Sequence, residues 1–169
     1  MKIDSSSLIY LTKIDLIDHV VNNFSPIRIT ESVFSEVIEK GKEMSFGDAF
    51  ILEKMVEKKK ITVVPNISTI PDALISLGLG EQSSIAEATK EKELLLIDDV
   101  KARRRATSLS VDVLGTEAII LSLLHFKKLS YDEFEEKINA AARIMSLKAS
   151  KIMALLSEAK KLAGKDDAD

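Results

Sequence analysis

Short apolar runs recur along the chain and predict the strands of a sheet. Residues 94–98 read Leu-Leu-Leu-Ile-Asp, a continuous apolar run that ends in an acid, which is typical of a strand buried on both faces. Shorter runs of this kind lie at residues 2–4, 27–29, 61–64 and 111–114. Segments with helical periodicity separate these runs, and the alternation predicts an α/β fold in which helices cover a parallel sheet.

Helix caps and apolar stripes mark the segments between the strands. Thr30 is placed to cap one helix and Ser45 to open the next, while Ser130 and Glu133 form a capping box before a third. Apolar residues at steps of three and four continue through the helices after Leu129. Such stripes need a partner surface. We expect these helices to pack on the sheet; the alternative is that they pack against a second copy of the chain in a dimer.

Length and composition fit one globular domain. The chain has 169 residues, of which 46% are hydrophobic and 30% are charged, enough to form a full hydrophobic core. It contains no cysteine, which excludes disulfides, thiolate metal sites and cysteine nucleophiles. The first residues turn polar too soon for a secretory signal, and no apolar run approaches the roughly 20 residues that span a bilayer. We therefore expect a cytoplasmic protein without membrane contact.

Two acids, Asp4 and Asp98, directly follow predicted strands. The carboxyl ends of parallel strands meet at one edge of a sheet, where ligands usually bind. Three further acids are candidates to join them: Glu36 borders the apolar side of its helix, Glu81 stands in the first turn of another, and Asp99 adjoins Asp98. Each acid also has a simpler interpretation as a strand end, a helix cap or part of a solvated face.

A cluster of these acids would have a chemical consequence. Carboxylates that lie together raise one another's pKa by repulsion, and this costs folding free energy unless cations neutralise them. Oxygen ligands of this kind suit Mg²⁺ or Mn²⁺. Such a metal lowers the pKa of its bound water and stabilises charge that builds on a phosphate. The acids therefore indicate hydrolysis of phosphodiester bonds.

A dense run of cations follows the acids. Helical phase groups Lys101, Arg104 and Arg105 on one side of the predicted helix. Because the formal net charge is -3, binding to a nucleic acid requires a local basic face of this kind. Phosphate steering and an ordinary solvated helix surface explain these cations equally well. His19 and His125 have no paired ligand spacing, and we interpret both as structural.

The order of four short motifs resembles that of the PIN-domain ribonucleases over residues 1–129. The motifs are Asp4-Ser5-Ser6, Ser35-Glu36-Val37, Gly80-Glu81, and Leu96-Ile97-Asp98-Asp99 followed by Ala102-Arg103. The stretch from Gly80-Glu81 to Val113-Leu114-Gly115-Thr116 is similar to a prokaryotic PIN subfamily related to the toxins of toxin–antitoxin pairs.

This resemblance implies a PIN-like three-layer fold, with a central parallel sheet of about five strands flanked by helices and with extra C-terminal helices. It implies that four acids bind metal and act in catalysis, namely Asp4, Glu36, Glu81 and Asp98. Asp99 would adjoin them as a further metal ligand, and the Ser6 hydroxyl would contact the substrate. It also implies cleavage of RNA that depends on Mg²⁺ or Mn²⁺, a homodimer, and an antitoxin protein as a partner.

The resulting domain organisation has three parts. Residues 1–129 form the PIN core, residues 130–163 form a helical extension packed on the core or at a dimer interface, and residues 164–169 form a disordered tail. A catalytically silent PIN-like module that binds protein or RNA is the alternative function, and the retained acids favour catalysis over it. A phosphatase with a strand-end nucleophile is less favoured, because Asp4 lacks a second aspartate two positions later.

Overall fold

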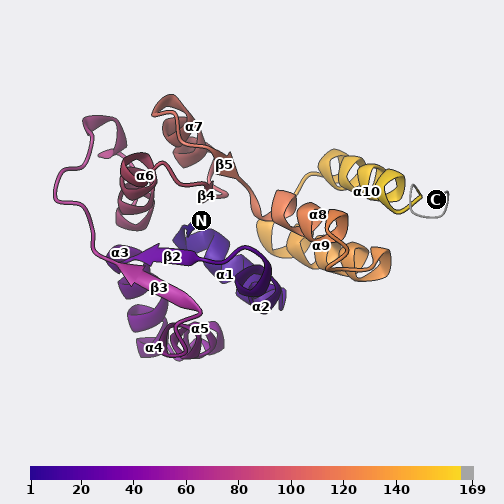
Figure 1. Ribbon diagram of the computed structural model, residues 1–169, viewed down its shortest axis with the longest axis horizontal. Helices are drawn as coiled ribbons and strands as arrows, with labels where there is room; N and C mark the ends of the chain where they lie inside the picture. Colours follow the sequence, from indigo (N-terminus) through magenta and orange to yellow (C-terminus); the bar gives the residue numbers. More distant parts are fainter. Residues whose placement is uncertain (165–169) are drawn as a thin grey trace. The chain divides into compact units, whose positions relative to one another are not determined.

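The computed structural model describes residues 1–164 of the chain (Figure 1). These residues belong to two compact units, Met1–Gly115 and a second unit that begins at Thr116. The first unit ends at Gly115, whereas the sequence-based boundary of the PIN core was placed after Leu129. Each unit is described by itself.

The first unit contains a five-stranded sheet in which every strand pair is parallel. Its strands are β1 (Lys2–Ile3), β2 (Ile27–Thr30), β3 (Ile61–Val64), β4 (Leu95–Leu96) and β5 (Val113–Leu114). Their order is β3-β2-β1-β4-β5, so β1 is the central strand and lies between β2 and β4. This arrangement confirms the α/β class and the parallel sheet predicted from the apolar runs.

Helices flank this sheet, as expected for parallel strands joined by helical crossovers. They are α1 (Ser5–Lys13), α2 (Ile17–Asn23), α3 (Glu31–Phe34), the π-helical segment η1 (Ser35–Glu39), α4 (Lys40–Glu43), α5 (Gly47–Glu57), the 3-10 turn η2 (Asp72–Leu74), α6 (Leu79–Glu91) and α7 (Val100–Ser108). Helix α6 contacts β1, β2 and β4, helix α7 contacts β5, and helix α5 contacts β3.

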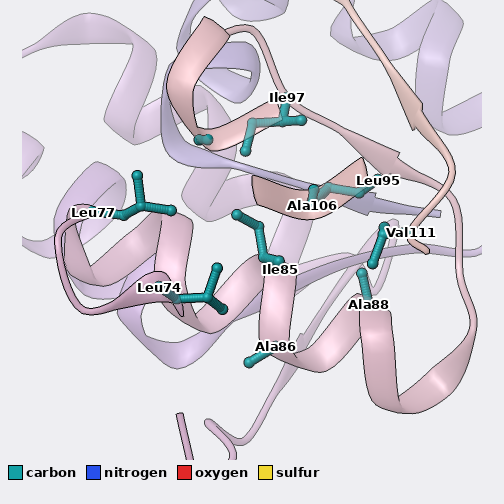
Figure 2. Close-up of a cluster of buried hydrophobic side chains, with 10 residues drawn as sticks. Leu74, Leu77, Ile85, Ala86, Ala88, Leu95, Ile97, Ala106 and Val111 are labelled. Carbon is teal, nitrogen blue, oxygen red and sulfur yellow. The ribbon is translucent and has the colours of Figure 1, made fainter. Parts of the chain in front are cut away.

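A buried cluster joins α6 and α7 to the sheet and thereby fixes the elements around β4 (Figure 2). Ile85 of α6 points towards Ile97, which directly follows β4, while Val111 closes the cluster before β5. Full burial of one Leu or Ile side chain contributes roughly 1.5–3 kcal/mol, so the cluster holds this part of the unit firmly. The members are Leu74, Leu77, Ile85, Ala86, Ala88, Leu95, Ile97, Ala102, Ala106 and Val111.

Two details of the helices differ from the sequence-based expectation. Thr30 does cap α3, since its Oγ1 accepts a hydrogen bond from Val33 N at 3.3 Å, but the helix then widens into the π-helical segment η1 before α4. The prediction that Ser45 opens the next helix is wrong. Ser45 has a φ of 59°, the left-handed conformation that ends α4, and α5 begins only at Gly47.

The second unit is built from α8 (Thr116–His125), α9 (Tyr131–Met145) and α10 (Ala149–Gly164), which contact one another. The predicted capping box is confirmed, because Ser130 Oγ accepts from Glu133 N while Glu133 accepts from Ser130 N. Gly164 ends α10, and the remainder of the predicted tail, 165–169, lies outside the described residues. None of the helices in residues 1–164 is long and apolar enough to cross a membrane.

Candidate active site

The candidate site begins at the carboxyl ends of two neighbouring strands. Strands β1 and β4 are paired with Ile3 opposite Leu96, so the chain leaves both strands at the same edge of the sheet. Asp4 is the first residue after β1, and its backbone N–H still donates to Leu96 O at 3.1 Å. Asp98 follows β4 after one further residue. The strand topology therefore delivers both carboxylates to one edge, as the sequence predicted.

Three consecutive serines at the start of α1 connect this edge to a third acid. Ser5 Oγ donates to Glu36 Oε2 at 2.7 Å, Ser6 Oγ donates to Asp4 Oδ2 at 2.8 Å, and Ser7 Oγ donates to Asp98 Oδ2 at 2.8 Å. Successive residues in a helix point about 100° apart, which lets neighbouring hydroxyls reach different acids. The first turn of α1 thus links Asp4, Glu36 and Asp98 in one network of hydrogen bonds.

Asp4 is the most deeply buried of these acids. The residue is 1% exposed and is the N-cap of α1, where its Oδ1 accepts from Ser7 N at 3.0 Å. Burial raises the pKa of Asp4 from 3.8 to about 6; repulsion from Asp98 adds to this rise, while the hydrogen bonds from Ser7 and Ser6 oppose it. The fold therefore keeps a carboxyl group whose negative charge it disfavours, and a cation would relieve that cost.

Tyr10 lies close enough to this edge to be affected by the acids. It is half-buried one turn after Ser6 on α1. Burial, together with the charges of Asp98 and Asp4, raises the pKa of the Tyr10 hydroxyl. The direction of this change shows that Tyr10 lies within electrostatic range of both carboxylates.

Glu36 joins the network from an irregular part of its helix. It lies in η1, and such π-helical insertions are frequent at functional sites. Its carboxylate meets the first turn of α6 as well as Ser5: a Cβ added to Gly80 would lie 2.5 Å from Glu36 Oε2 and 2.6 Å from Ser5 Oγ. Only a residue without a Cβ permits this approach. Elements α1, η1 and α6 therefore converge on the Glu36 carboxylate.

The other two predicted acids make different contacts. Glu81 Oε2 accepts from Gly78 N at 3.0 Å and caps α6, and Asp99 Oδ1 accepts from Ala102 N at 2.7 Å and caps α7. Both bonds satisfy helix N-termini, which is the simpler interpretation considered for these residues. The hydrogen bonds of the α1 serines therefore unite three of the five predicted acids, and the proposed roles of Glu81 and Asp99 in metal binding stay predictions.

The chemistry of the donors suits a hard cation. The network offers only carboxylate and hydroxyl oxygens, the ligand type that Mg²⁺ and Mn²⁺ prefer. Among residues 1–164, however, no group of three or more Asp, Glu, His or Cys side chains is arranged to hold one metal ion. Mg²⁺ commonly binds through one or two carboxylates and retains several waters. Asp4 and Asp98, which both bond to Ser7, fit that requirement without a third acid.

The predicted substrate contacts lie on α7 and α1. Arg104 and Arg105 are exposed on α7, and Lys101 Nζ donates to Ser76 O at 2.8 Å, which ties α7 to the segment before α6. Arg103, which the sequence interpretation did not select, donates from Nη2 to Ile97 O at 3.1 Å. Ser6 is engaged with Asp4. None of these contacts tests a role in substrate binding.

Sequence reasoning missed four residues of this site. Ser5, Ser7 and Gly80 contact the acids directly, and Tyr10 lies within their electrostatic reach. Of the three hydroxyls after Asp4, only that of Ser6 was selected, as a contact to substrate. A helical projection of the first turn after β1 would have shown that consecutive hydroxyls fan out towards different neighbours.

Comparison with known proteins agrees with this geometry. A family model described as a PIN domain matches residues 2–161, which include nearly all of the described chain. No curated protein and no solved structure gives a significant match. PIN domains are usually nucleases and generally use divalent metal ions. The match covers far more than half of the sequence, and the chain therefore belongs to the PIN-domain family.

Proposed function

We propose that this protein is a divalent-metal-dependent endoribonuclease that hydrolyses phosphodiester bonds of RNA. The observation that carries the proposal is the pair of strand-end carboxylates, Asp4 and Asp98, both bonded to Ser7 at the carboxyl edge of the sheet. Burial makes the charge of Asp4 costly in the absence of a cation. Retaining such a carboxyl next to a second one is most readily explained by metal binding.

In this mechanism, Asp4 and Asp98 would hold Mg²⁺ or Mn²⁺, and the metal would lower the pKa of water and neutralise charge on the phosphate. Ser6 and Ser7 orient the two carboxylates through the hydrogen bonds described above. Glu36 is exposed, whereas Asp4 is buried. We therefore assign to Glu36 Oε1 the role of accepting a proton from the attacking water. Its Oε2 is held by Ser5.

The cations of α7 supply the contacts to the RNA backbone in this proposal. Arg104 and Arg105 are exposed, and Lys101 stands one turn earlier on the same helix. The helix follows directly after Asp98 and Asp99, so its N-terminal turn begins at the acidic edge. A chain with net charge -3 needs such a local basic face to attract a polyanion.

We further propose that the protein acts in the cytoplasm as the toxin of a toxin–antitoxin pair and forms a homodimer. The family supports a nuclease role, and large apolar side chains are exposed on and beside α4 and α5. They are Met44, Phe46, Phe50 and Ile51. Exposed apolar residues in such numbers often mark protein interfaces. Light scattering after size exclusion tests the dimer, and co-purification with the product of a neighbouring reading frame tests the antitoxin.

A catalytically silent module that binds RNA or protein is the second candidate function. It is favoured by one observation, the finding that no three acids or imidazoles within the described residues are arranged around a metal position. The two candidates differ in what they require of Asp4 and Asp98. A silent module needs neither carboxylate to bind RNA, whereas the nuclease needs both for cleavage.

The test is cleavage of a fluorescent single-stranded RNA by the purified chain in Mn²⁺, in Mg²⁺ and in EDTA. We expect cleavage in either metal, none in EDTA, and loss of activity in Asp4→Asn and in Asp98→Asn. Asp112→Asn is a matched control, because Asp112 is an exposed acid that precedes β5. Cleavage by both site variants at the wild-type rate would refute the proposal. Binding of intact RNA without cleavage by the wild-type protein would favour the silent module.

A further inference from the structure

The backbone of Gly80 approaches the acidic site more closely than any other residue type would allow. An added Cβ would lie 2.5 Å from Glu36 Oε2 and 2.6 Å from Ser5 Oγ, both well inside the distance that real Cβ atoms keep. The third neighbour, Val33 Cγ2 at 3.6 Å, is an ordinary van der Waals contact. The space that this glycine leaves open is therefore filled by the Ser5–Glu36 hydrogen bond alone.

The first turn of α6 is anchored and does not readily move away from this contact. Ser83 Oγ donates to Gly80 O at 3.0 Å and lies 2.7 Å from Thr30 Oγ1. Thr30 and Ser83 are fully or almost fully buried, and Thr30 in turn caps α3. This chain of hydroxyls ties α6 to the end of β2. A side chain at position 80 would accordingly displace the end of Glu36 before it displaced the helix.

We propose that Gly80 and Ser5 are positioning residues for Glu36. The bare backbone at Gly80 lies against Glu36 Oε2, and the Ser5 hydroxyl donates to the same oxygen. This inference rests on the proposed function, in which Glu36 takes a proton from water. It adds that the placement of Glu36 depends on a helix, α6, whose own predicted acid, Glu81, is occupied in capping.

The proposal separates activity from stability. A new Cβ meets the far end of a flexible glutamate and the Ser5 hydroxyl, and both groups can turn away by rotating about side-chain bonds without movement of a helix. Alanine also favours a helix over glycine by about 1 kcal/mol, which compensates for part of the remaining strain. Gly80→Ala should therefore fold as well as the wild-type protein and yet hold Glu36 in the wrong place.

The experiment compares Gly80→Ala and Ser5→Ala with Gly78→Ala, a matched control at the start of the same helix. A Cβ at Gly78 would meet only Glu81 Oε2 at an ordinary 3.7 Å. We expect kcat for RNA cleavage to fall about 100-fold in Gly80→Ala, because a misplacement of about 1 Å can cost that much. The KM for RNA and the urea midpoint of Gly80→Ala should stay unchanged, and Gly78→Ala should match the wild type in kcat and KM.

Two further measurements locate the effect at Glu36. In a Glu36→Ala background, Gly80→Ala should cause no further loss of kcat, because the side chain that it displaces is gone. The carbon-13 resonance of the Glu36 carboxyl should shift in Gly80→Ala and Ser5→Ala but not in Gly78→Ala. Equal kcat in Gly80→Ala and Gly78→Ala would overturn the inference. If the wild-type protein cleaves no RNA, the proposed function fails, but the positioning role can still be tested by the carbon-13 resonance. An unshifted Glu36 signal in Gly80→Ala and Ser5→Ala would then overturn that role.

Discussion

Replacing Asp4 by asparagine removes a negative charge that the fold buries. Asparagine retains an oxygen that can accept from Ser7 N, and it caps helices about as well as aspartate. It differs at the other atom: Asp4 Oδ2 accepts from Ser6, whereas an asparagine nitrogen can only donate there. The substitution therefore tests the energetic effect of the charge with little change in shape.

The magnitude follows from the pKa of Asp4, which rises from 3.8 to about 6 on folding, mainly through burial. A difference of roughly 2 units corresponds to about 3 kcal/mol. Because the folded pKa is the higher one, the folded protein binds the proton more tightly, and stability falls as the pH rises from about 4 to about 6. Above about pH 6 the buried charge of Asp4 lowers the free energy of unfolding by its full amount, and below about pH 4 it lowers it not at all.

We expect Asp4→Asn to raise the free energy of unfolding by about 2 kcal/mol near pH 7.5 in EDTA. This value subtracts about 1 kcal/mol for the altered bond to Ser6 from the 3 kcal/mol of relieved charge. Near pH 3.5, where Asp4 is protonated in the folded protein, only the unfavourable 1 kcal/mol should remain. The sign of the effect should therefore reverse with pH.

Urea denaturation followed by far-ultraviolet circular dichroism at the two pH values measures this reversal, with Asp112→Asn as the exposed control. Saturating Mn²⁺ should stabilise the wild-type protein by about 2.7 kcal/mol at a concentration one hundred times Kd, and should stabilise Asp4→Asn far less. An equal loss of stability in Asp4→Asn at both pH values would refute the reasoning, since it would mean that the folded protein does not disfavour the charge.

Two further predictions concern charges away from the acidic edge. Lys2 is 1% exposed and lies 3.6 Å from Glu87 and 3.7 Å from Glu93. Glu93 also pairs with Arg28, so Lys2→Ala should deprive mainly the buried Glu87 carboxylate of its cation and lower the urea-unfolding free energy by about 3 kcal/mol, whereas an unchanged midpoint would contradict burial of the Lys2–Glu87 pair. Arg104→Gln and Arg105→Gln should each lower the salt dependence of RNA binding by about 0.7 in logarithmic slope. A slope equal to the wild-type value in both variants would show that neither arginine contacts the RNA backbone.

Sequence patterns predicted the elements that hydrophobicity and backbone chemistry control locally. The apolar run that ends at Asp98 indicated a strand buried on both faces, and the cap at Thr30 and the capping box at Ser130 are present as expected. These signals are readable because they depend on residues within a few positions of one another. Ser45 was misread because a serine before a helix can cap it or end the preceding helix, and the left-handed backbone at that position decides for the latter.

The shared edge of Asp4 and Asp98 was predictable from sequence alone, because both acids directly follow short apolar runs typical of strands in a parallel sheet. The other groups that reach these two acids depend on contacts between separate elements. Glu36, in the π-helical segment, accepts from Ser5, and the absence of a Cβ at Gly80 leaves room for that bond, whereas Glu81 and Asp99 cap helix N-termini. These outcomes depend on distances between elements far apart in sequence, which the periodicity of a single segment does not contain.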